Sequence, residues 1–241
     1  YSTLAEQLES DGTIESSKKI GLVKSTSILQ YDKHLNTFKL YIPVKEDSIN
    51  IDNRTNKCGI DPGIRTFLTC YSDEMIIEIG ENAYERFRKH YKKIDHVNSL
   101  YDKDELSEKK YKKVLYKQYD KLHNLIKDLH YKSAKILSIK FDIVQLGKIS
   151  TKSIVSNENN LNKISKRCMY GLSHFTFRER LKFQCTKRNS VCNVVDESYT
   201  TKTCCMCGTR KDVGRSKIYD CKNCGCVIDR DINASKNIYM K

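Results

Sequence analysis

The sequence predicts an α/β fold built on a mixed sheet, with a long helical insertion and a small inserted cysteine-rich module. Short apolar segments alternate with helical stretches along the chain, and one of these stretches is unusually long. Six of the eleven cysteines lie between Cys204 and Cys226. A chain of 241 residues has room for a substantial core beside such a module.

The first 52 residues predict the C-terminal part of a β-rich, nucleic-acid-binding module. Residues 20–29 and 37–44 alternate apolar and polar side chains, as half-buried strands do. Residues 45–56 have the composition of a linker, and we expect a second domain over residues 53–241. Because the chain starts with Tyr1 and not Met, we expect it to be a fragment that lacks an N-terminal region.

The second domain begins with three short strands, each bounded by turn residues. The first strand ends at Asp61, and Pro62-Gly63 forms the turn that follows. The predicted strands are 57–60, 66–71, 75–79, 141–150 and 190–197. The predicted helices are 81–95 and 105–139, which form an insertion over 81–139, then 173–188, and a last helix near Asp231. Residues 151–165 are predicted as loop.

This order of elements is the plan of the ribonuclease H-like fold. In that fold a three-strand meander is followed by helical crossovers to further strands, and the first strand lies mid-sheet beside the fourth. The end of the first strand and the start of the last helix then meet at one edge of the sheet.

The cysteine-rich segment predicts a structural zinc ribbon over residues 199–228. Two Cys-x2-Cys pairs are separated by thirteen residues, and a glycine follows each pair. Four thiolates at this spacing surround Zn²⁺ tetrahedrally and leave no open position for catalysis. We predict Cys204, Cys207, Cys221 and Cys224 as the ligands. Cys205 and Cys226 flank the pairs and could substitute as ligands, although simple packing beside them is the ordinary explanation.

The charge balance favours a polyanionic partner. Lys and Arg number 44 against 30 Asp and Glu, a net charge of +14, although a solvated surface explains this equally well. No stretch is apolar enough to favour a membrane partner. No secretory signal precedes the cysteines, so we expect an intracellular protein, nuclear in a eukaryotic host and otherwise in the cytoplasm or nucleoid.

Asp61 and Asp231 each have an ordinary structural explanation, as a turn residue and as a helix N-cap. Together, at one edge of a ribonuclease H-like sheet, they predict a site for two Mg²⁺ ions that support phosphodiester cleavage.

Several segments resemble the RuvC-type nuclease core of the TnpB and Fanzor family, transposon-encoded RNA-guided nucleases related to type V CRISPR effectors. They are "GIDPGIRTFLT", "DLHYKSAKIL", "TTKTCCMCG" and "YDCKNCGCVIDRDINASKNI". The resemblance covers most of residues 55–241 and is strongest to the Fanzor and giant-virus branch. It implies that Asp61 and Asp231 are catalytic aspartates, that the four cysteines bind zinc, and that guide RNA and target DNA are partners.

One position departs from the family pattern. The family commonly has a glutamate at the end of the fourth strand, where this chain has Gln145 and Gly147. Glu197, at the end of the neighbouring fifth strand, is the natural substitute, because adjacent strands lie only about 4.8 Å apart. The alternative is that Glu197 is an exposed strand-end residue and the site is impaired.

The sequence therefore predicts a Mg²⁺-dependent, RNA-guided DNA endonuclease with Asp61, Glu197 and Asp231 as its metal ligands. A catalytically silent DNA- or RNA-binding protein derived from the same family is the alternative, and a zinc-ribbon transcription factor explains less. Oligomeric state, monomer or dimer, stays open. The predicted nucleic-acid contacts are Arg65, Arg86, Arg88, Lys89, Lys132 and Arg178.

Overall fold

The computed structural model describes residues 26–33, 36–43, 47–155, 162–214 and 216–241, and it divides into two units at residues 46 and 47. In the first unit, strands β1 (Ile28–Asp32) and β2 (Thr37–Tyr41) form an antiparallel hairpin in which Ile28 pairs with Tyr41. Most of the predicted strand over residues 20–29 lies outside the described residues, and β1 continues beyond it to Asp32.

The second unit is built on a five-stranded mixed sheet in the order β5-β4-β3-β6-β7. Strands β3 (Thr55–Pro62), β4 (Leu68–Tyr71) and β5 (Ile76–Ile79) form the predicted antiparallel meander. Strand β3 then pairs in parallel with β6 (Phe141–Gly147), which pairs in parallel with β7 (Val191–Val195). The first strand of the meander therefore lies mid-sheet beside the fourth, as predicted.

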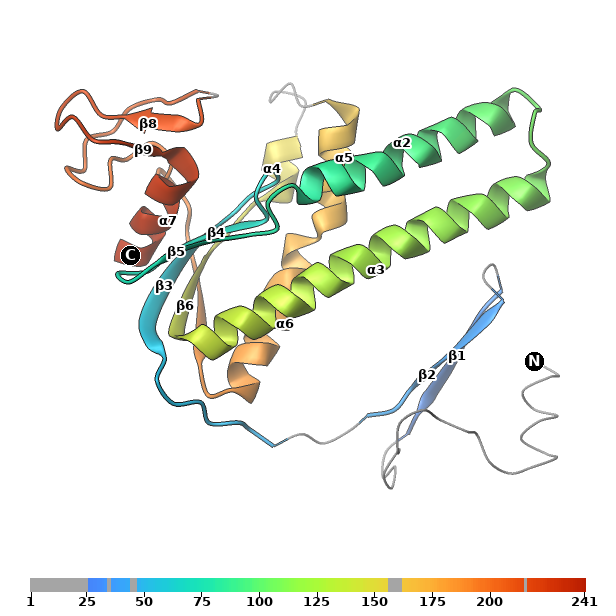
Figure 1. Ribbon diagram of the computed structural model, residues 1–241, viewed down its shortest axis with the longest axis horizontal. Helices are drawn as coiled ribbons and strands as arrows, with labels where there is room; N and C mark the ends of the chain where they lie inside the picture. The colour runs from blue at the N-terminus through green and yellow to red at the C-terminus, as the bar shows by residue number, and fades with distance from the viewer. Residues whose placement is uncertain (1–25, 34–35, 44–46, 156–161, 215) are drawn as a thin grey trace. The chain divides into compact units, whose positions relative to one another are not determined.

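Helices cover the two faces of this sheet unequally (Figure 1). On one face, α3 (Glu108–Lys140) and α6 (His174–Lys187) contribute Leu137 and Phe177 to a core that also contains Ile60 of β3 and Leu146 of β6. Helix α2 (Ala83–Asp102) packs against α3, and its buried side chains join the same core.

The opposite face is covered by the last helix, α7 (Arg230–Met240), which lies directly on β3. A Cβ atom at Gly59 would lie 2.3 Å from the backbone nitrogen of Tyr239 and 2.4 Å from the carbonyl oxygen of Ser235. Only a residue without a side chain permits this approach. Gly59 therefore sets how closely the last helix packs on the sheet.

The structure corrects the predicted loop over residues 151–165. A short helix α4 (Thr151–Val155) begins this segment, and α5 (Lys163–Leu172) begins within it. The side chain of Asn162 caps α5 by accepting a hydrogen bond of 2.8 Å from the backbone nitrogen of Ser165. The asparagine-rich run suggested a loop because asparagine favours turns, but it equally favours the helix N-cap that Asn162 provides.

Several boundaries differ from the prediction. Strand β3 runs through Asp61 to Pro62, so Pro62 belongs to the strand and not to the turn, and β6 ends at Gly147, three residues before the predicted end at residue 150. Helix α2 continues to Asp102, seven residues beyond the predicted end at residue 95. Strand β7 ends at Val195, so Glu197 lies just past the strand and not on it.

Candidate functional site

The four predicted cysteines come together at one point. The sulfur atoms of Cys204, Cys207, Cys221 and Cys224 all lie within 4.8 Å of one another, the spacing of a metal centre. The Sγ atoms of Cys204 and Cys224 are 3.7 Å apart, and those of Cys207 and Cys221 are 3.6 Å apart. Cys205 and Cys226 lie outside this set, as predicted. Four thiolates without an open position suit a structural Zn²⁺.

The two cysteine pairs have matching backbone geometry. The nitrogen of Gly208 donates to the carbonyl of Cys204 at 3.0 Å, and that of Gly225 donates to Cys221 at 2.9 Å. Both glycines have positive φ angles, +74° and +71°, which explains why glycine follows each pair. Strands β8 (Ile218–Asp220) and β9 (Val227–Asp229) complete the ribbon as an antiparallel pair.

Two buried asparagines of α7 attach the ribbon to the rest of the second unit. The Asn233 carbonyl oxygen accepts from the backbone nitrogen of Cys205 at 2.9 Å, and its amide nitrogen donates to Thr203 at 2.8 Å. The Asn237 amide donates to the carbonyls of Thr200 and Thr203 at 2.8 and 2.7 Å. Sequence reasoning missed both residues. Their signal was two amides four residues apart on a helix face that also carries Ala234 and Ile238.

Asp61 lies on the α7 side of the sheet. It follows Gly59 by two residues on β3, so both project to the face that α7 covers. Asp61 is partly buried. Burial raises its pKa well above the ordinary range, and the charges of Glu197, Asp231 and Asp229 raise it further, against an opposing effect of Arg230. Asp61 is thus close enough to both other predicted ligands for their charges to act on it.

The Glu197 carboxyl group lies where a side chain at position 147 would lie. A Cβ atom added to Gly147 would be 2.4 Å from Oε1 of Glu197 and 2.8 Å from its Cγ. Gly147 continues the β3–β6 ladder one residue beyond the Ile60–Leu146 pair, which puts it beside Asp61. The carboxyl group that β6 lacks is therefore supplied, at that place, from the segment after β7.

The segment around Glu197 is fixed by Lys241. Its Nζ atom donates to the carbonyl oxygen of Asp196 at 2.5 Å and to that of Ser198 at 3.4 Å, the residues on either side of Glu197. Burial raises the pKa of Glu197 to about 7, the charge of Asp196 adds to this effect, and Lys241 opposes it.

Asp231 lies in the first turn of α7, and Asp229 is the N-cap. The Asp229 carboxylate accepts from the backbone nitrogen of Asp231 at 2.8 Å and from that of Ile232 at 3.3 Å. The expectation that Asp231 itself caps this helix is wrong. Because Asp229 accepts from the backbone nitrogens at the start of α7, the side chain of Asp231 is not needed as the helix cap. The Arg230 guanidinium lies 3.4 Å from Oδ1 of Asp231.

The oxygen atoms at this edge of the sheet suit a hard divalent cation. Among the described residues, Oε1 of Glu197 and Oε1 of Gln145 are buried without a hydrogen-bond partner. Buried anionic oxygens in mutual repulsion gain most from a cation. Within the described part of the chain, however, only the four cysteines have ligand atoms that all lie within 4.8 Å of one another. The oxygen atoms of the three carboxyl groups are therefore farther apart than this.

The predicted nucleic-acid contacts do not gather in one place. Arg86 and Lys132 line one cavity between α2 and α3, where Lys132 also pairs with Asp128 at 2.8 Å. Arg65 lines a separate cavity. Arg88 pairs with Glu85 at 3.0 Å, Lys89 is exposed, and Arg178 lies near the end of β6.

Comparison with known proteins connects this arrangement to one class. The model of the Cas12f1-like TNB domain matches residues 174–238, from the start of α6 into α7. Among solved structures, a Cas12f1 complex with single guide RNA and target DNA aligns with a TM-score of 0.56 at 16% identity, over 84% of this chain and 53% of that one. A Cas12f ternary complex gives 0.53 at 15% identity, over 84% and 41%. The fold is thus a mixed α/β fold similar to Cas12f.

Sequence relatives are more specific. A TnpB-like protein of Acanthamoeba polyphaga mimivirus is 40% identical over 235 residues, 93% of this chain and 45% of the relative. A second from the same virus is 39% identical over the same shares. The chain belongs to the TnpB family, as its motifs predicted, and it spans about half the length of these relatives. Assignment to the Fanzor branch stays a prediction.

No helix within the described ranges is long and apolar enough to cross a membrane.

Proposed function

We propose that this chain is the nuclease half of an RNA-guided DNA endonuclease with a RuvC-type, ribonuclease H-like fold. Asp61, Glu197 and Asp231 would hold two Mg²⁺ ions, and the four cysteines would hold a structural Zn²⁺. Membership of the TnpB family supports the class of activity, and the guide RNA and target DNA named for the Cas12f1 complex are the partners we propose here.

One observation carries this proposal: the Glu197 carboxyl group fills the space above Gly147, beside Asp61. A third carboxyl group therefore occupies this place although β6 provides none. Burial, which raises the pKa of Glu197 to about 7, makes such an acid costly unless a partner such as a metal ion offsets it.

The protein groups have distinct tasks in this proposal. Divalent ions held by these residues would supply the charge that activates a water molecule and stabilises the leaving oxygen. The charges of both other acids act on Asp61, Lys241 holds the Glu197 segment, and Asp229 caps the first turn of α7, which leaves the Asp231 carboxyl group available to a metal ion. Arg230 restrains the Asp231 carboxylate.

Cleavage of labelled single-stranded and guide-matched duplex DNA tests the proposal, with the chain co-expressed with its native flanking RNA. We expect Mg²⁺-dependent cleavage that Asp61→Ala and Glu197→Gln each lower by more than the roughly 10–100-fold typical of supporting residues. Asp104→Asn is the control, because Asp104 is an exposed acid in the connection between α2 and α3. Cleavage retained in Glu197→Gln would remove Glu197 from the site.

Gly147→Ala adds a sharper test. Its methyl group needs the space that Glu197 Oε1 occupies, so we expect a large loss of cleavage. The double variant Gly147→Glu with Glu197→Ala, which moves the acid to β6, should recover part of that activity. Equal cleavage by Gly147→Ala and the parent chain would contradict the proposed position of the third ligand.

A catalytically silent nucleic-acid-binding protein is the second candidate. The uncharged Gln145 and Gly147 on β6 favour it, together with the wide spacing of the three carboxyl groups. It is the correct reading if the zinc-loaded parent chain binds nucleic acid and never cuts.

A further inference from the structure

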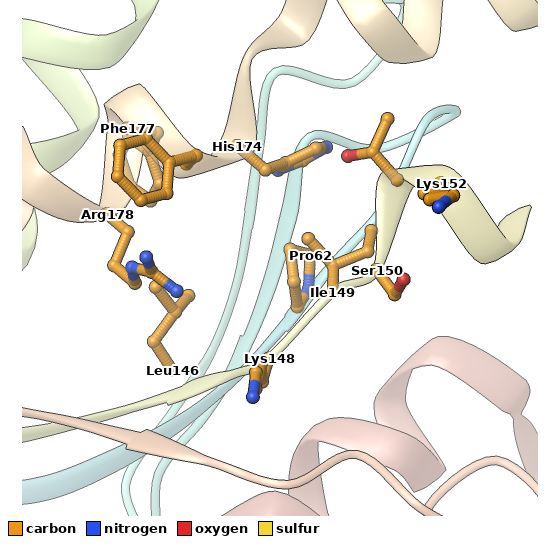
Figure 2. Close-up of a pocket in the computed structure, with 12 residues that line it drawn as sticks. Pro62, Leu146, Lys148, Ile149, Ser150, Lys152, His174, Phe177 and Arg178 are labelled. Atoms are coloured by element: carbon orange, nitrogen blue, oxygen red, sulfur yellow. The ribbon is translucent and has the colours of Figure 1, made fainter. Parts of the chain in front are cut away.

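A cavity of about 260 Å³ lies at the same edge of the sheet as the carboxyl groups, on the α6 side. Pro62 at the end of β3, the last residues of β6, residues 148–152 and the first turn of α6 line it (Figure 2). Pro62 directly follows Asp61, and Gly147 lies beneath the Glu197 carboxyl group. Open α/β sheets bind ligands outside the carboxyl ends of parallel strands, which is where this cavity lies.

The cavity is lined by positive charge. Lys148, Lys152 and Arg178 contribute to its wall, and no acidic residue is among the lining side chains in the described part of the chain. Arg178 pairs with Glu179 at 3.1 Å outside the lining, while Lys148 and Lys152 are exposed. The positive end of the α6 dipole also lies here, because His174 and Phe175 begin that helix. An anionic ligand is therefore favoured.

His174 gives the cavity a buried hydrogen-bonding group that the fold leaves largely unused. The residue is only 5% exposed, and neither ring nitrogen reaches hydrogen-bond geometry with a partner among the described residues, although the Gly63 backbone lies near the ring. Figure 2 shows its ring extending from α6 toward the segment that carries Lys152. Burial and the neighbouring His130 lower its pKa to about 4, and the nearby Gly63 carbonyl opposes this only in part. The neutral ring offers one donor and one acceptor.

Phe175 adds an aromatic surface at the mouth of the cavity. Its ring is 67% exposed, and the guanidinium carbon of Arg178 lies 4.7 Å from the ring centroid. Proteins that bind single-stranded nucleic acids often place an exposed aromatic ring next to Lys or Arg side chains. A base stacks on the ring, and the cations neutralise the phosphates. A ligand that suits this cavity therefore has a negative charge, a flat ring, and hydrogen-bonding groups at the edge of that ring.

We propose that this cavity holds one nucleotide of a single strand, with its phosphate near Lys148, Lys152 and Arg178, its base on the exposed ring of Phe175, and His174 as the hydrogen-bonding group deeper in the cavity. The inference rests on the proposed nuclease function and deepens it, because a strand held here continues over the sheet edge toward Asp61 and Glu197. The cavity is too small for a duplex, so the bound nucleotide belongs to an unpaired segment of DNA or RNA.

Binding measured without cleavage tests this inference. Fluorescence anisotropy would follow the 241-residue chain carrying Asp61→Ala, in EDTA-free buffer without Mg²⁺ so that the zinc stays bound. The probes are labelled oligothymidylate, oligouridylate and an abasic DNA of equal length, each about 12 nucleotides. His174→Phe removes both ring nitrogens and keeps a ring against Phe67, whose centroid lies 5.3 Å away. Phe175→Ala changes only an exposed side chain.

We expect His174→Phe and Phe175→Ala each to weaken binding of a base-bearing strand about tenfold and to change abasic DNA little. Lys148→Ala with Arg178→Ala should weaken all three probes. Lys109→Ala, an exposed cation on α3, is the control for lost charge. If the variants lose more affinity for oligothymidylate, the bound strand is DNA, and if they lose more for oligouridylate, it is RNA. Equal losses mean that the pocket accepts both.

The inference is overturned if both base-side variants bind all probes within twofold of Lys109→Ala. Should His174→Phe not fold, Phe175→Ala decides alone. The nuclease proposal can fail independently of this inference. If the parent chain never cleaves DNA but the variants still lose affinity, the pocket is supported and the nuclease is not. Cleavage with unaltered affinity supports the nuclease without the pocket.

Discussion

At the scale of single residues, His130 is held in its neutral form by two opposed hydrogen bonds. Arg180 donates to Nδ1 at 2.9 Å, and because arginine only donates, the ring proton must lie on Nε2, which donates to the Leu172 carbonyl at 2.8 Å. The ring is fully buried beside Phe67 and Phe177. Burial lowers its pKa to about 4, and the charges of Arg180 and His123 act in the same direction, against the bond to Leu172.

This arrangement makes stability depend on pH. Between the folded pKa of about 4 and the ordinary value of about 6.5, the unfolded chain binds the proton and the folded chain does not. The contribution of His130 is therefore complete above pH 6.5 and is lost as pH falls toward 4, by about 2 kcal/mol at pH 5. Urea unfolding of the parent chain and of His130→Gln at pH 7 and pH 5 measures it.

The expected result is a smaller loss of unfolding free energy in His130→Gln than in the parent chain. His174 keeps part of the dependence in both proteins, since its pKa is also lowered to about 4. An equal loss in the two proteins would show that His130 is not the titrating group.

Residue-level prediction from sequence succeeded where spacing along the chain carries the chemistry. The four cysteines were predictable because two tight pairs have few other uses, and the structure brings them together. Glu197 was predicted as the substitute for an acid on β6, but its place above Gly147 was not, because that depends on the register of β6 beside β7 and on the loop after β7. The buried pair His130 and His174 gave no sequence signal, since their environment comes from α6 packing on α3.

At the scale of elements, α7 has two neighbours and connects them. One face lies on Gly59 of β3, and Asn233 and Asn237 hold the start of the zinc ribbon. Asn233→Ala leaves the buried nitrogen of Cys205 without this partner, whereas the Thr203 carbonyl still accepts from Asn237. One unsatisfied buried group costs about 1–3 kcal/mol, so we expect a destabilisation of that size.

Thermal unfolding with a parallel assay of bound zinc checks this prediction. The zinc content should stay at one ion per chain, because the four thiolates are unchanged, while the unfolding midpoint falls. Met240→Ala is the control, since this α7 side chain is 55% exposed. A loss of zinc in Asn233→Ala at unchanged stability would mean that the asparagine supports the metal centre and not the junction.

Elements with strong periodicity or a clear strand pattern were predicted well, and capped short helices were not. The five sheet strands were all found, because alternating or continuous apolar runs bounded by turns have one simple interpretation. Helices α4 and α5 were missed because asparagine and serine serve both turns and N-caps, and only the Asn162 hydrogen bond distinguishes them.

At the scale of the whole molecule, the charge is confined to one unit. Residues 1–46 contain six basic and six acidic side chains, so the entire net charge of +14 belongs to residues 47–241. That unit also contains the core beneath the sheet, the carboxyl groups and the ribbon. Residues 47–241 should therefore fold alone and keep the electrostatic part of nucleic-acid binding.

Deletion of residues 1–46 tests this expectation. We expect an unchanged unfolding midpoint and an unchanged slope of log affinity for single-stranded DNA against log salt, because the slope counts neutralised phosphates. A shallower slope in the shortened chain would assign phosphate contacts to residues 1–46, in agreement with the predicted nucleic-acid-binding module there.

The packing of α7 on Gly59 has a consequence for the order of synthesis. On the ribosome, β3 with Asp61 emerges early, whereas Glu197 emerges after the whole helical insertion and Asp231 later still, behind the ribbon. A nascent chain can pair β3, β4 and β5 before α7 has been made, so the face of β3 at Gly59 is still uncovered at that stage. All three acids are present only once α7 has been synthesised. Under the proposed function, an unfinished chain lacks at least one of the three acids and so cannot cut the nucleic acid around it, and premature termination anywhere before α7 yields a protein without the proposed activity.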